Sequence, residues 1–403
     1  MDLHVRPTEP DDAFCRVTFT AFGEEPTEER VADELDWADH DRFIGAFDGD
    51  QVVGTAGAYS FEQTLPGGAI VPVAGVTSVA VLPTHRRRGA LTAMMRQQLD
   101  DVVERGEPMA ILTASEASIY GRFGYGVATR AQKVRIDTAG GLPLRVPCRA
   151  EGTFRLLTAD EVIPTLAPLQ EAMRRATPGD ILRPPKWWDV HVRDRNDWRG
   201  GASHRFDVVH STGGVVDGSL SYRIKQIDRS VAPGWEVNLG QLLATDPEVE
   251  LALLQYASEI DLTASMLTWG RRVDDWLPYR LVDSRRYRIE RVVDHVYARV
   301  LDVPRVLSAR TYEGEGTLVL EVVDDFRPAS GGTFRLAGGA CEPADGATPD
   351  LVLDASSLGS LVLGDVRPSV LAAAGRVTGS VDAIAVADRL FPTARLPFTA
   401  LDF

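Results

Sequence analysis

The sequence predicts a mixed α+β fold that is divided among more than one domain. Its 403 residues exceed the length of one ordinary domain. Predicted strands and helices are interleaved along the chain, which is typical of mixed sheets covered by helices. In addition, residues 42–63 align without a gap to residues 205–226, and six positions of the two segments are identical. We therefore expect the same order of strands and helix to be used twice.

The first domain is expected over residues 1–149. An N-terminal strand leads into a helix that is capped by Thr8 or by the pair Asp11 and Asp12. Two strands joined by a tight turn follow over 42–61. The other elements expected here are a strand over 73–83, a helix over 89–105, a strand over 109–114, a short helix over 119–123 and one strand over 126–137.

A second domain is expected over 150–297 and a third over 298–403. The second repeats the hairpin and continues with a strand over 235–245 and a helix from Pro247. The third has an α+β pattern of its own, in which no catalytic constellation is visible. The sequence ends in the apolar stretch LPFTALDF without a polar tail, so we expect Phe403 to be packed against the protein.

Composition argues against several classes of partner. The formal net charge of -15 disfavours nucleic acid and anionic membranes, both of which reward dense positive charge, and it suits a cationic substrate. No apolar run reaches the roughly 18 residues that span a bilayer, and no basic segment followed by an apolar one opens the chain, so we expect a cytoplasmic protein. Three widely separated cysteines and seven histidines without metal-ligand spacing predict free thiols and no metal site.

Three consecutive arginines are unusual in so acidic a chain. Arg86, Arg87 and Arg88 lie with Gly89 between a predicted strand and a predicted helix. The amide groups and partial positive charge of a helix N-terminus bind phosphate well where glycine lets the ligand approach. The second copy has carboxylates here, from Asp246 onward, so only the first is expected to bind an anionic cofactor. The alternative is a solvated arginine cluster that ends a surface strand.

A longer motif resembles that of a known protein family. PTHRRRGALTAMM (83–95) together with TASEASIYGRFGYGVAT (113–129) resembles the Eis-like (enhanced intracellular survival) acetyltransferases of the GCN5-related N-acetyltransferase (GNAT) superfamily. Arg86-x-x-Gly89 matches the start of that superfamily's R-x-x-G-x-[GA] pyrophosphate loop, with Leu91 in place of the last small residue. The resemblance extends to tandem acetyltransferase units, the segment ILRPPKWWD, a sterol-carrier-protein-like last domain and the terminus ALDF.

The resemblance implies an architecture and a cosubstrate. It makes 1–149 the catalytic GNAT domain, 150–297 a degenerate GNAT domain without a cofactor loop, and 298–403 a sterol-carrier-protein-like domain. It implies that acetyl-CoA lies along the strand and loop of the first domain. The residues that would hold its pantetheine arm, its phosphates and the far end of the arm are Val79, Ala80, Val81, Arg86, Arg87, Arg88, Gly89, Ala90, Leu91, Thr92, Ser115 and Glu116.

The resemblance also implies the chemistry, which is N-acetylation of a primary amine on an aminoglycoside-like polyamine or a lysine side chain. No cysteine falls in the motif, so we expect direct transfer without a covalent intermediate. Tyr120 matches the family's proton donor, although a tyrosine in so aromatic a segment is often a core residue. The main-chain carboxylate of Phe403 matches the proton acceptor, whereas from the residues alone Phe403 is a packed terminal aromatic. Side chains that could line the amine pocket are Glu24, Trp37, Trp188 and Asp402, with a core position as the alternative for Trp188.

Two further expectations concern the whole protein. The resemblance implies a homo-oligomer, with a hexamer as its form. A different class of function is a lipid or acyl-CoA binding protein, in which the last domain binds the ligand and the acetyltransferase units are relics. The intact arginine loop beside a tyrosine counts against this alternative.

Overall fold

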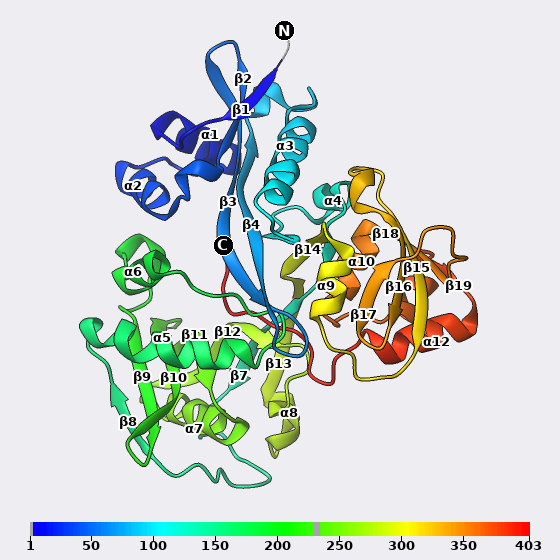
Figure 1. Ribbon diagram of the computed structural model, residues 1–403. Helices are drawn as coiled ribbons and strands as arrows, with labels where there is room; N and C mark the ends of the chain where they lie inside the picture. The colour runs from blue at the N-terminus through cyan, green and yellow to red at the C-terminus, as the bar shows by residue number, and fades with distance from the viewer. Residues whose placement is uncertain (1–2, 229–233) are drawn as a thin grey trace. The chain divides into compact units, whose positions relative to one another are not determined.

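The computed structural model describes residues 3–228 and 234–403, which belong to two compact units. The first unit contains the chain up to Thr129, residues 178–186 and residues 295–403, and the second contains residues 130–177 and 187–294. In Figure 1 the colour runs from blue at the N-terminus to red at the C-terminus, so these residue ranges can be followed along the chain. Within the described residues, no helix has the length and apolar character needed to cross a membrane.

The first unit is organised around a seven-stranded sheet. Its strand order is β1 (His4–Pro7), β2 (Ile44–Asp48), β3 (Gln51–Thr64), β4 (Ile70–Val81), β5 (Met109–Thr113), β14 (Val296–Val300) and β6 (Gly126–Val127). β4 and β5 run parallel, but they pair only from Val73 to Gly75 on β4, which itself continues to Val81. The sheet therefore opens between the carboxyl ends of these two strands.

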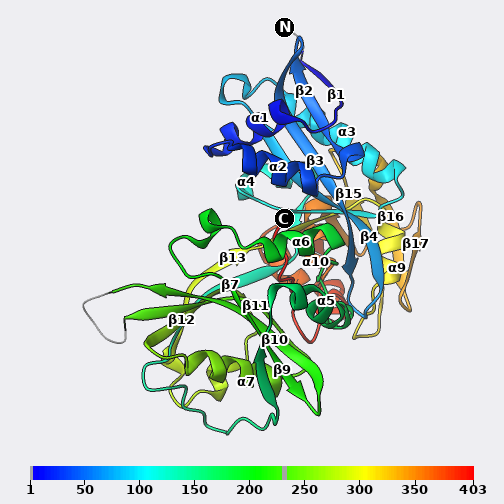
Figure 2. The same cartoon turned by 90° about the vertical axis from the view of Figure 1, so that its left-hand side faces the viewer.

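Helices cover both faces of this sheet, as Figures 1 and 2 show, with α1 (Asp12–Phe22) and α2 (Glu28–Trp37) on one face and α3 (Ala90–Glu104) on the other. Alternate residues of β3 serve the two faces. Thr55 contacts Thr18 of α1 through their hydroxyls at 3.1 Å, whereas Ala56 packs with Met94 of α3. The N-cap of α1 is Asp11, whose carboxylate accepts from the third residue of the helix.

The second unit repeats this plan. Its seven-stranded sheet has the order β13 (Tyr287–Asp294), β7 (Arg130–Asp137), β12 (Thr263–Arg272), β11 (Trp235–Ala244), β10 (Val215–Gln226), β9 (Phe206–Thr212) and β8 (Thr153–Leu156). As in the first sheet, a hairpin, a third antiparallel strand and a helix lead to a parallel strand. The helices are α5 (Ala159–Arg175), α6 (Pro185–Arg193), α7 (Pro247–Ser258) and the short α8 (Leu277–Arg280), and α6 belongs to this unit from its third residue onward. The expected repetition of the fold is confirmed.

The two sheets exchange strands along the chain. β14 lies between β5 and β6 in the first sheet, and β7 lies between β12 and β13 in the second. The expectation of one strand over 126–137 is therefore wrong, because β6 and β7 belong to different sheets. The compact units change after residues 129, 177, 186 and 294. The domain boundaries expected after residues 149 and 297 stay a prediction. An alternating pattern identifies a strand but not its neighbour, so the sequence did not reveal the exchange.

The last domain has a five-stranded sheet of its own, in the order β17 (Ala340–Pro343), β16 (Gly332–Ala337), β15 (Thr317–Val323), β18 (Leu351–Asp354) and β19 (Val377–Gly379). Its helices are α9 (Val303–Ala309), α10 (Ala355–Leu361), α11 (Pro368–Ala373) and α12 (Val381–Leu390). Every residue of α10 is buried, and this helix packs against β14 and β6 of the first sheet. The last domain is thus continuous with the first unit.

Candidate active site

A bulge near the end of β4 shapes the opening in the first sheet. Ser78 has a φ of +52°, a left-handed value that residues with side chains rarely adopt, and the β3–β4 register shifts at this point. The Thr55 hydroxyl donates to the carbonyl of Ser78 at 2.8 Å and holds the bulge. Beyond it, Ala80 and Val81 pair with β3 on one side, while the pairing with β5 has ended on the other. This backbone therefore presents a strand edge to an extended ligand.

The loop between β4 and α3 leaves room for a ligand at the helix start. Arg87 and Gly89 have φ values of +63° and +85°, and Gly89 occupies the N-cap position of α3. A β-carbon at Gly89 would meet no atom within 4 Å, so the space before it is open. No side chain of the described chain caps this helix. Its first amide groups are therefore available to an anion.

A pocket of about 560 Å³ lies over this loop and the β4 edge. It brings together most of the cofactor residues expected from the sequence and the expected acid, Tyr120. The expected residues that line it are Val79, Ala80, Val81, Arg86, Arg87, Gly89, Ala90, Leu91, Thr92, Ser115 and Glu116. Lining residues without an assignment from the sequence are Ala21, Phe22, His85, Ile119 and Arg122.

Two of the lining residues without an assignment could have been recognised from the sequence. Arg122 lies two residues after Tyr120, so its charge could have been grouped with the arginine loop. Phe22 is 49% exposed just before Gly23, which ends α1, and an exposed aromatic there suggests a contact surface. No local sequence pattern, however, predicts that the end of α1 lies beside the carboxyl end of β4.

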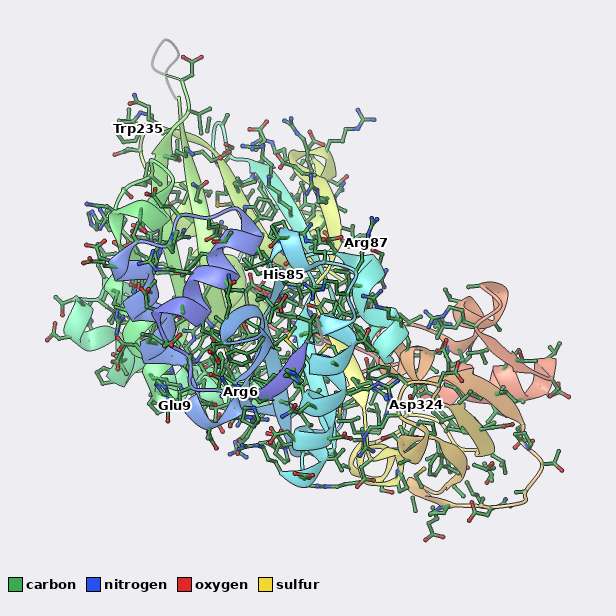
Figure 3. All side chains as sticks on the ribbon, turned by 90° about the horizontal axis from the view of Figure 1, so that it is seen from above. Arg6, Glu9, His85, Arg87, Trp235 and Asp324 are labelled. Carbon is green, nitrogen blue, oxygen red and sulfur yellow. The ribbon has the colours of Figure 1, made fainter. Side chains whose placement is uncertain are left out.

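Arg88 departs from the expected arrangement. Its guanidinium donates to the Asp48 carboxylate at 3.0 Å, and the Nε2 atom of His85 lies 3.4 Å from the same carboxylate. The hydrogen bond from Arg88 lowers the pKa of Asp48. Asp48 ends β2, so this contact ties the loop to the β2–β3 turn. Arg88 does not line the pocket, whereas His85 and Arg87, both marked in Figure 3, do.

Burial distinguishes the two tyrosines of the motif. Tyr120 ends the short helix α4 (Ala117–Tyr120), lines the pocket and is 8% exposed. Burial, with a smaller contribution from the nearby Glu116 carboxylate, raises the pKa of Tyr120 to about 12, so its phenol keeps its proton at neutral pH. Tyr125 is 1% exposed, does not line the pocket and packs edge-on against Tyr120, with 6.0 Å between ring centroids. Of the two, Tyr120 is the one that can meet a ligand there.

The last residue of the sequence lies at the carboxyl end of β5. The Thr113 hydroxyl donates to the main-chain oxygen of Phe403 at 2.8 Å. The half-buried Phe403 ring packs edge-on against Phe61, with 5.1 Å between ring centroids, whereas Asp402 is exposed. Neither Phe403 nor Asp402 lines the pocket. Because Thr113 lies only two residues before Ser115, the same strand end contacts Phe403 and leads into the segment that carries Tyr120.

The other candidates for substrate binding are not brought into this pocket. Glu24 forms an ion pair with Arg30 at 2.7 Å, and Trp37 is half-buried in the last turn of α2. Trp188 is 4% exposed and belongs to a hydrophobic cluster of the second unit that includes Val209. The position of Trp188 agrees with the alternative that it is a core residue.

The corresponding helix of the second unit begins differently. The carboxylate of Asp246 caps α7 and accepts from the amides of Glu248 at 2.7 Å and Val249 at 3.1 Å. Glu248 in turn accepts from Arg280 at 2.9 Å. The protein's own carboxylate therefore occupies the amide groups that an anionic ligand would need.

Family models divide the chain into three parts. Models of the acetyltransferase (GNAT) domain match residues 5–128 and 179–300, and a model of the sterol carrier protein domain matches residues 303–400. Both GNAT matches fall on the repeated sheets, and the third falls on the five-stranded sheet with α10.

Relatives resemble the chain over most of its length. An uncharacterised N-acetyltransferase of Streptomyces coelicolor is 41% identical over 390 residues, which cover 94% of this chain and 93% of the relative. The N-acetyltransferase Eis of Mycobacterium tuberculosis is 34% identical over 350 residues, which cover 83% of this chain and 81% of Eis. The crystal structure of Eis1 from Mycobacterium abscessus matches with a TM-score of 0.88 and 33% identity over the whole of both chains.

Proposed function

Since this chain belongs to the Eis-like N-acetyltransferases of the GNAT superfamily, we propose that it transfers the acetyl group of acetyl-CoA directly to a primary amine of a cationic substrate. The substrate is an aminoglycoside-like polyamine or a lysine side chain. The observation that supports this proposal most is the pocket in which the arginine loop and Tyr120 meet. The acidic net charge of -15 agrees with a cationic substrate.

Acetyl-CoA is the cosubstrate of GNAT domains, and the residues of the pocket fit it. The open space before Gly89 and the uncapped start of α3 suit a pyrophosphate, which accepts hydrogen bonds from helix amides. Arg86 and Arg87 line the same space and supply charge for the phosphates. The free edge at residues 79–81 suits the amide groups of the pantetheine arm.

Tyr120 is proposed as the general acid. As the amine nitrogen bonds to the acetyl carbon, the carbon–sulfur bond breaks and coenzyme A leaves as a thiolate. A thiol has a pKa near 8.5, so the thiolate needs a proton at neutral pH. The buried Tyr120 phenol carries a proton and can donate it to the sulfur, and the second proton that the nitrogen loses as the amide forms restores the phenol.

The terminal carboxylate of Phe403 is proposed as the base. An alkyl ammonium has a pKa of about 10.4, so freeing its lone pair at pH 7 costs about 4 to 5 kcal/mol. The carboxylate takes this proton, directly or through one water, and the hydrogen bond from Thr113 holds it at the β5 end. Asp402 is exposed beside it and adds negative charge that attracts the ammonium group.

Direct transfer is preferred to a route through an acetyl-cysteine. Cys15, Cys148 and Cys341 do not line the pocket. Burial also raises the pKa of Cys15 to about 12 and that of Cys341 to about 11, which disfavours their nucleophilic thiolates. The amine is therefore the nucleophile that attacks the thioester.

Thiol release from acetyl-CoA tests the proposal. We expect release that depends on an added polyamine or lysine peptide, with one acetyl group found on the amine by mass spectrometry for each thiol formed. A protein that binds CoA in calorimetry but releases no thiol with any amine of the panel would instead be a binding protein for lipid or acyl-CoA.

A further inference from the structure

A buried ion pair lies behind the segment that carries Tyr120. Arg299 of β14 donates to Asp324, which follows β15, and the two side chains are 0% and 1% exposed. Arg299 also donates to the carbonyl of Val300 at 3.2 Å. Removal of either partner would leave an uncompensated charge in the interior, so the two side chains constrain each other strongly.

The guanidinium of Arg299 lies directly against the turn that follows Tyr120. Gly124 has a φ of +85°, and a β-carbon at this position would come within 2.7 Å of the Cζ atom of Arg299. The amide of Tyr125 donates to the carbonyl of Tyr120 at 3.3 Å and closes the turn. Arg299 therefore fills the space behind the backbone of residues 120–125.

Tyr125 links Arg299 to Tyr120. Its fully buried ring packs edge-on against Tyr120, and within the described chain its hydroxyl has no hydrogen-bond partner. Tyr125 directly follows Gly124, whose backbone the Arg299 guanidinium contacts, and the charge of Arg299 opposes the rise in the pKa of Tyr125 that burial causes. Because the interior is closely packed, we expect a shift of Arg299 to move the backbone at Gly124 and, with it, the Tyr125 ring that packs against Tyr120.

The last domain supports the same turn from another side. The hydroxyl of Ser356 in α10 donates to the carbonyl of Tyr125 at 2.7 Å. A β-carbon at Gly126 would come within 1.9 Å of the carbonyl oxygen of Ser356, so the backbone after the turn touches the helix. Asp324 belongs to this domain as well.

We propose that Arg299 and Asp324 are positioning residues for Tyr120, because their ion pair fixes the turn over 120–125 and thereby the place of the phenol. The inference rests on the proposed function, since it assigns the pair to the proton donor of that reaction. In this proposal the last domain contributes to catalysis by holding the turn that carries Tyr120, and it does not need to bind a ligand itself.

A double-mutant cycle with Tyr120→Phe distinguishes an effect on the position of Tyr120 from a general loss of stability. Arg299→Lys keeps the charge but loses the planar fork of the guanidinium, and Asp324→Asn is a second, independent perturbation. Each is made in the wild-type chain and in Tyr120→Phe. We expect either change to lower kcat by about 10- to 100-fold with little change in KM for acetyl-CoA. In the Tyr120→Phe chain the same changes should lower kcat by less than about twofold.

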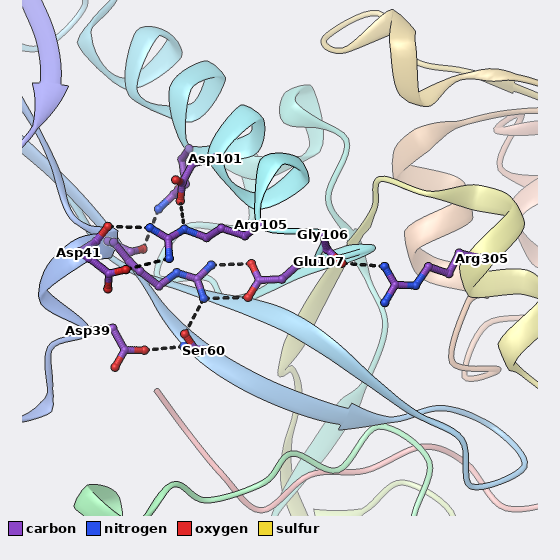
Figure 4. A network of polar contacts seen from close by, with 11 residues as sticks. Asp39, Asp41, Ser60, Asp101, Arg105, Gly106, Glu107 and Arg305 are labelled. Carbon is purple, nitrogen blue, oxygen red and sulfur yellow. Dashed lines mark hydrogen bonds and ion pairs between the residues drawn. The ribbon is translucent and has the colours of Figure 1, made fainter.

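Arg42→Lys is the matched control. Arg42 is another buried arginine of the first unit, which donates to Glu107 and to Ser60, both at 2.8 Å. Figure 4 labels these two acceptors. Its side-chain hydrogen bonds go to residues 60 and 107 and not to the turn over 120–125. We expect a comparable loss of thermal stability, and an effect on kcat that is the same with and without the Tyr120 hydroxyl.

Two outcomes would overturn the inference. The first is an equal loss of kcat from Arg299→Lys in the wild-type and Tyr120→Phe chains, a result that leaves the proposed function intact. The second comes from ring-labelled tyrosine NMR, in which Arg299→Lys should shift the Tyr120 resonance and Arg42→Lys should not; an unshifted resonance refutes positioning. This second readout applies even if the wild-type protein transfers no acetyl group, the result that would refute the proposed function itself.

Discussion

At the start of α3, Gly89 and the arginine loop face a pocket, whereas at the start of α7 the Asp246 carboxylate accepts hydrogen bonds from two amides of its own helix. The two helices hold the same place in two copies of one fold. A few side chains at one helix end thus decide whether the dipole and amide groups serve a ligand or the protein itself. The fold alone does not determine the function of either copy.

The largest expected effect separates Tyr120 from Tyr279, which lies on the corresponding short helix α8 of the second unit and is 84% exposed. Tyr120→Phe removes only the hydroxyl, so kcat should fall by about 100-fold or more if the phenol donates its proton. Tyr279→Phe should leave kcat unchanged. Steady-state thiol release measures both, and equal rates for the two variants would show that the acid lies elsewhere.

The second effect concerns a base that neither copy of the fold supplies. One extra residue after Phe403 moves the carboxylate away from Thr113, so we expect a loss in kcat of about 100-fold. Phe403→Leu keeps a carboxylate at the same place and should retain substantial activity. Calorimetry with CoA checks that both variants still bind the cosubstrate, and an active extended protein would exclude the terminal carboxylate.

Cosubstrate binding tests the comparison between the helix starts directly. Arg87→Ala removes a charge-assisted contact to phosphate, and the Kd for CoA should rise by about 10-fold or more. Gly89→Val should weaken binding similarly, since the left-handed backbone does not suit a β-branched residue. Glu248→Ala in the second unit is the matched change and should leave the Kd unchanged. If calorimetry gives all three variants the same Kd for CoA as the wild-type protein, the arginine loop does not bind the cosubstrate.

The smallest expected effect lies in the second unit. Asp246→Ala removes the side chain that caps α7, which should lower the free energy of unfolding by about 1 kcal/mol. Denaturant unfolding measures this loss, and the Kd for CoA serves as the control. A change in CoA affinity would mean that the second helix start is not isolated from the cosubstrate.

The features that the sequence predicted well are local ones. The arginine loop and the following helix lie within about twenty residues, and the helix expected over 89–105 is observed as α3, Ala90–Glu104. The motif that contains Tyr120 is equally compact. Periodicity and glycine placement act over such distances, so one sequence suffices to find them.

Features that depend on distant partners were missed. Arg88 looked like its neighbours, but its ion pair with Asp48 joins residues 40 positions apart. Trp188 could be read as core or pocket because its surroundings come from α5 and β9. Arg299 carried no signal at all, since a lone arginine in an apolar strand does not reveal that its partner Asp324 is also buried.

The exchange of β7 and β14 has a consequence for how the chain is made. β14 fills the gap between β5 and β6, and it is translated almost two hundred residues after β5. At typical elongation rates of 5–20 residues per second, the ribosome needs about 10 to 40 s to cover that distance. Until then the nascent first sheet exposes an unpaired edge of β5. The segment around Tyr120 can therefore reach its final place only after the whole second unit has left the ribosome.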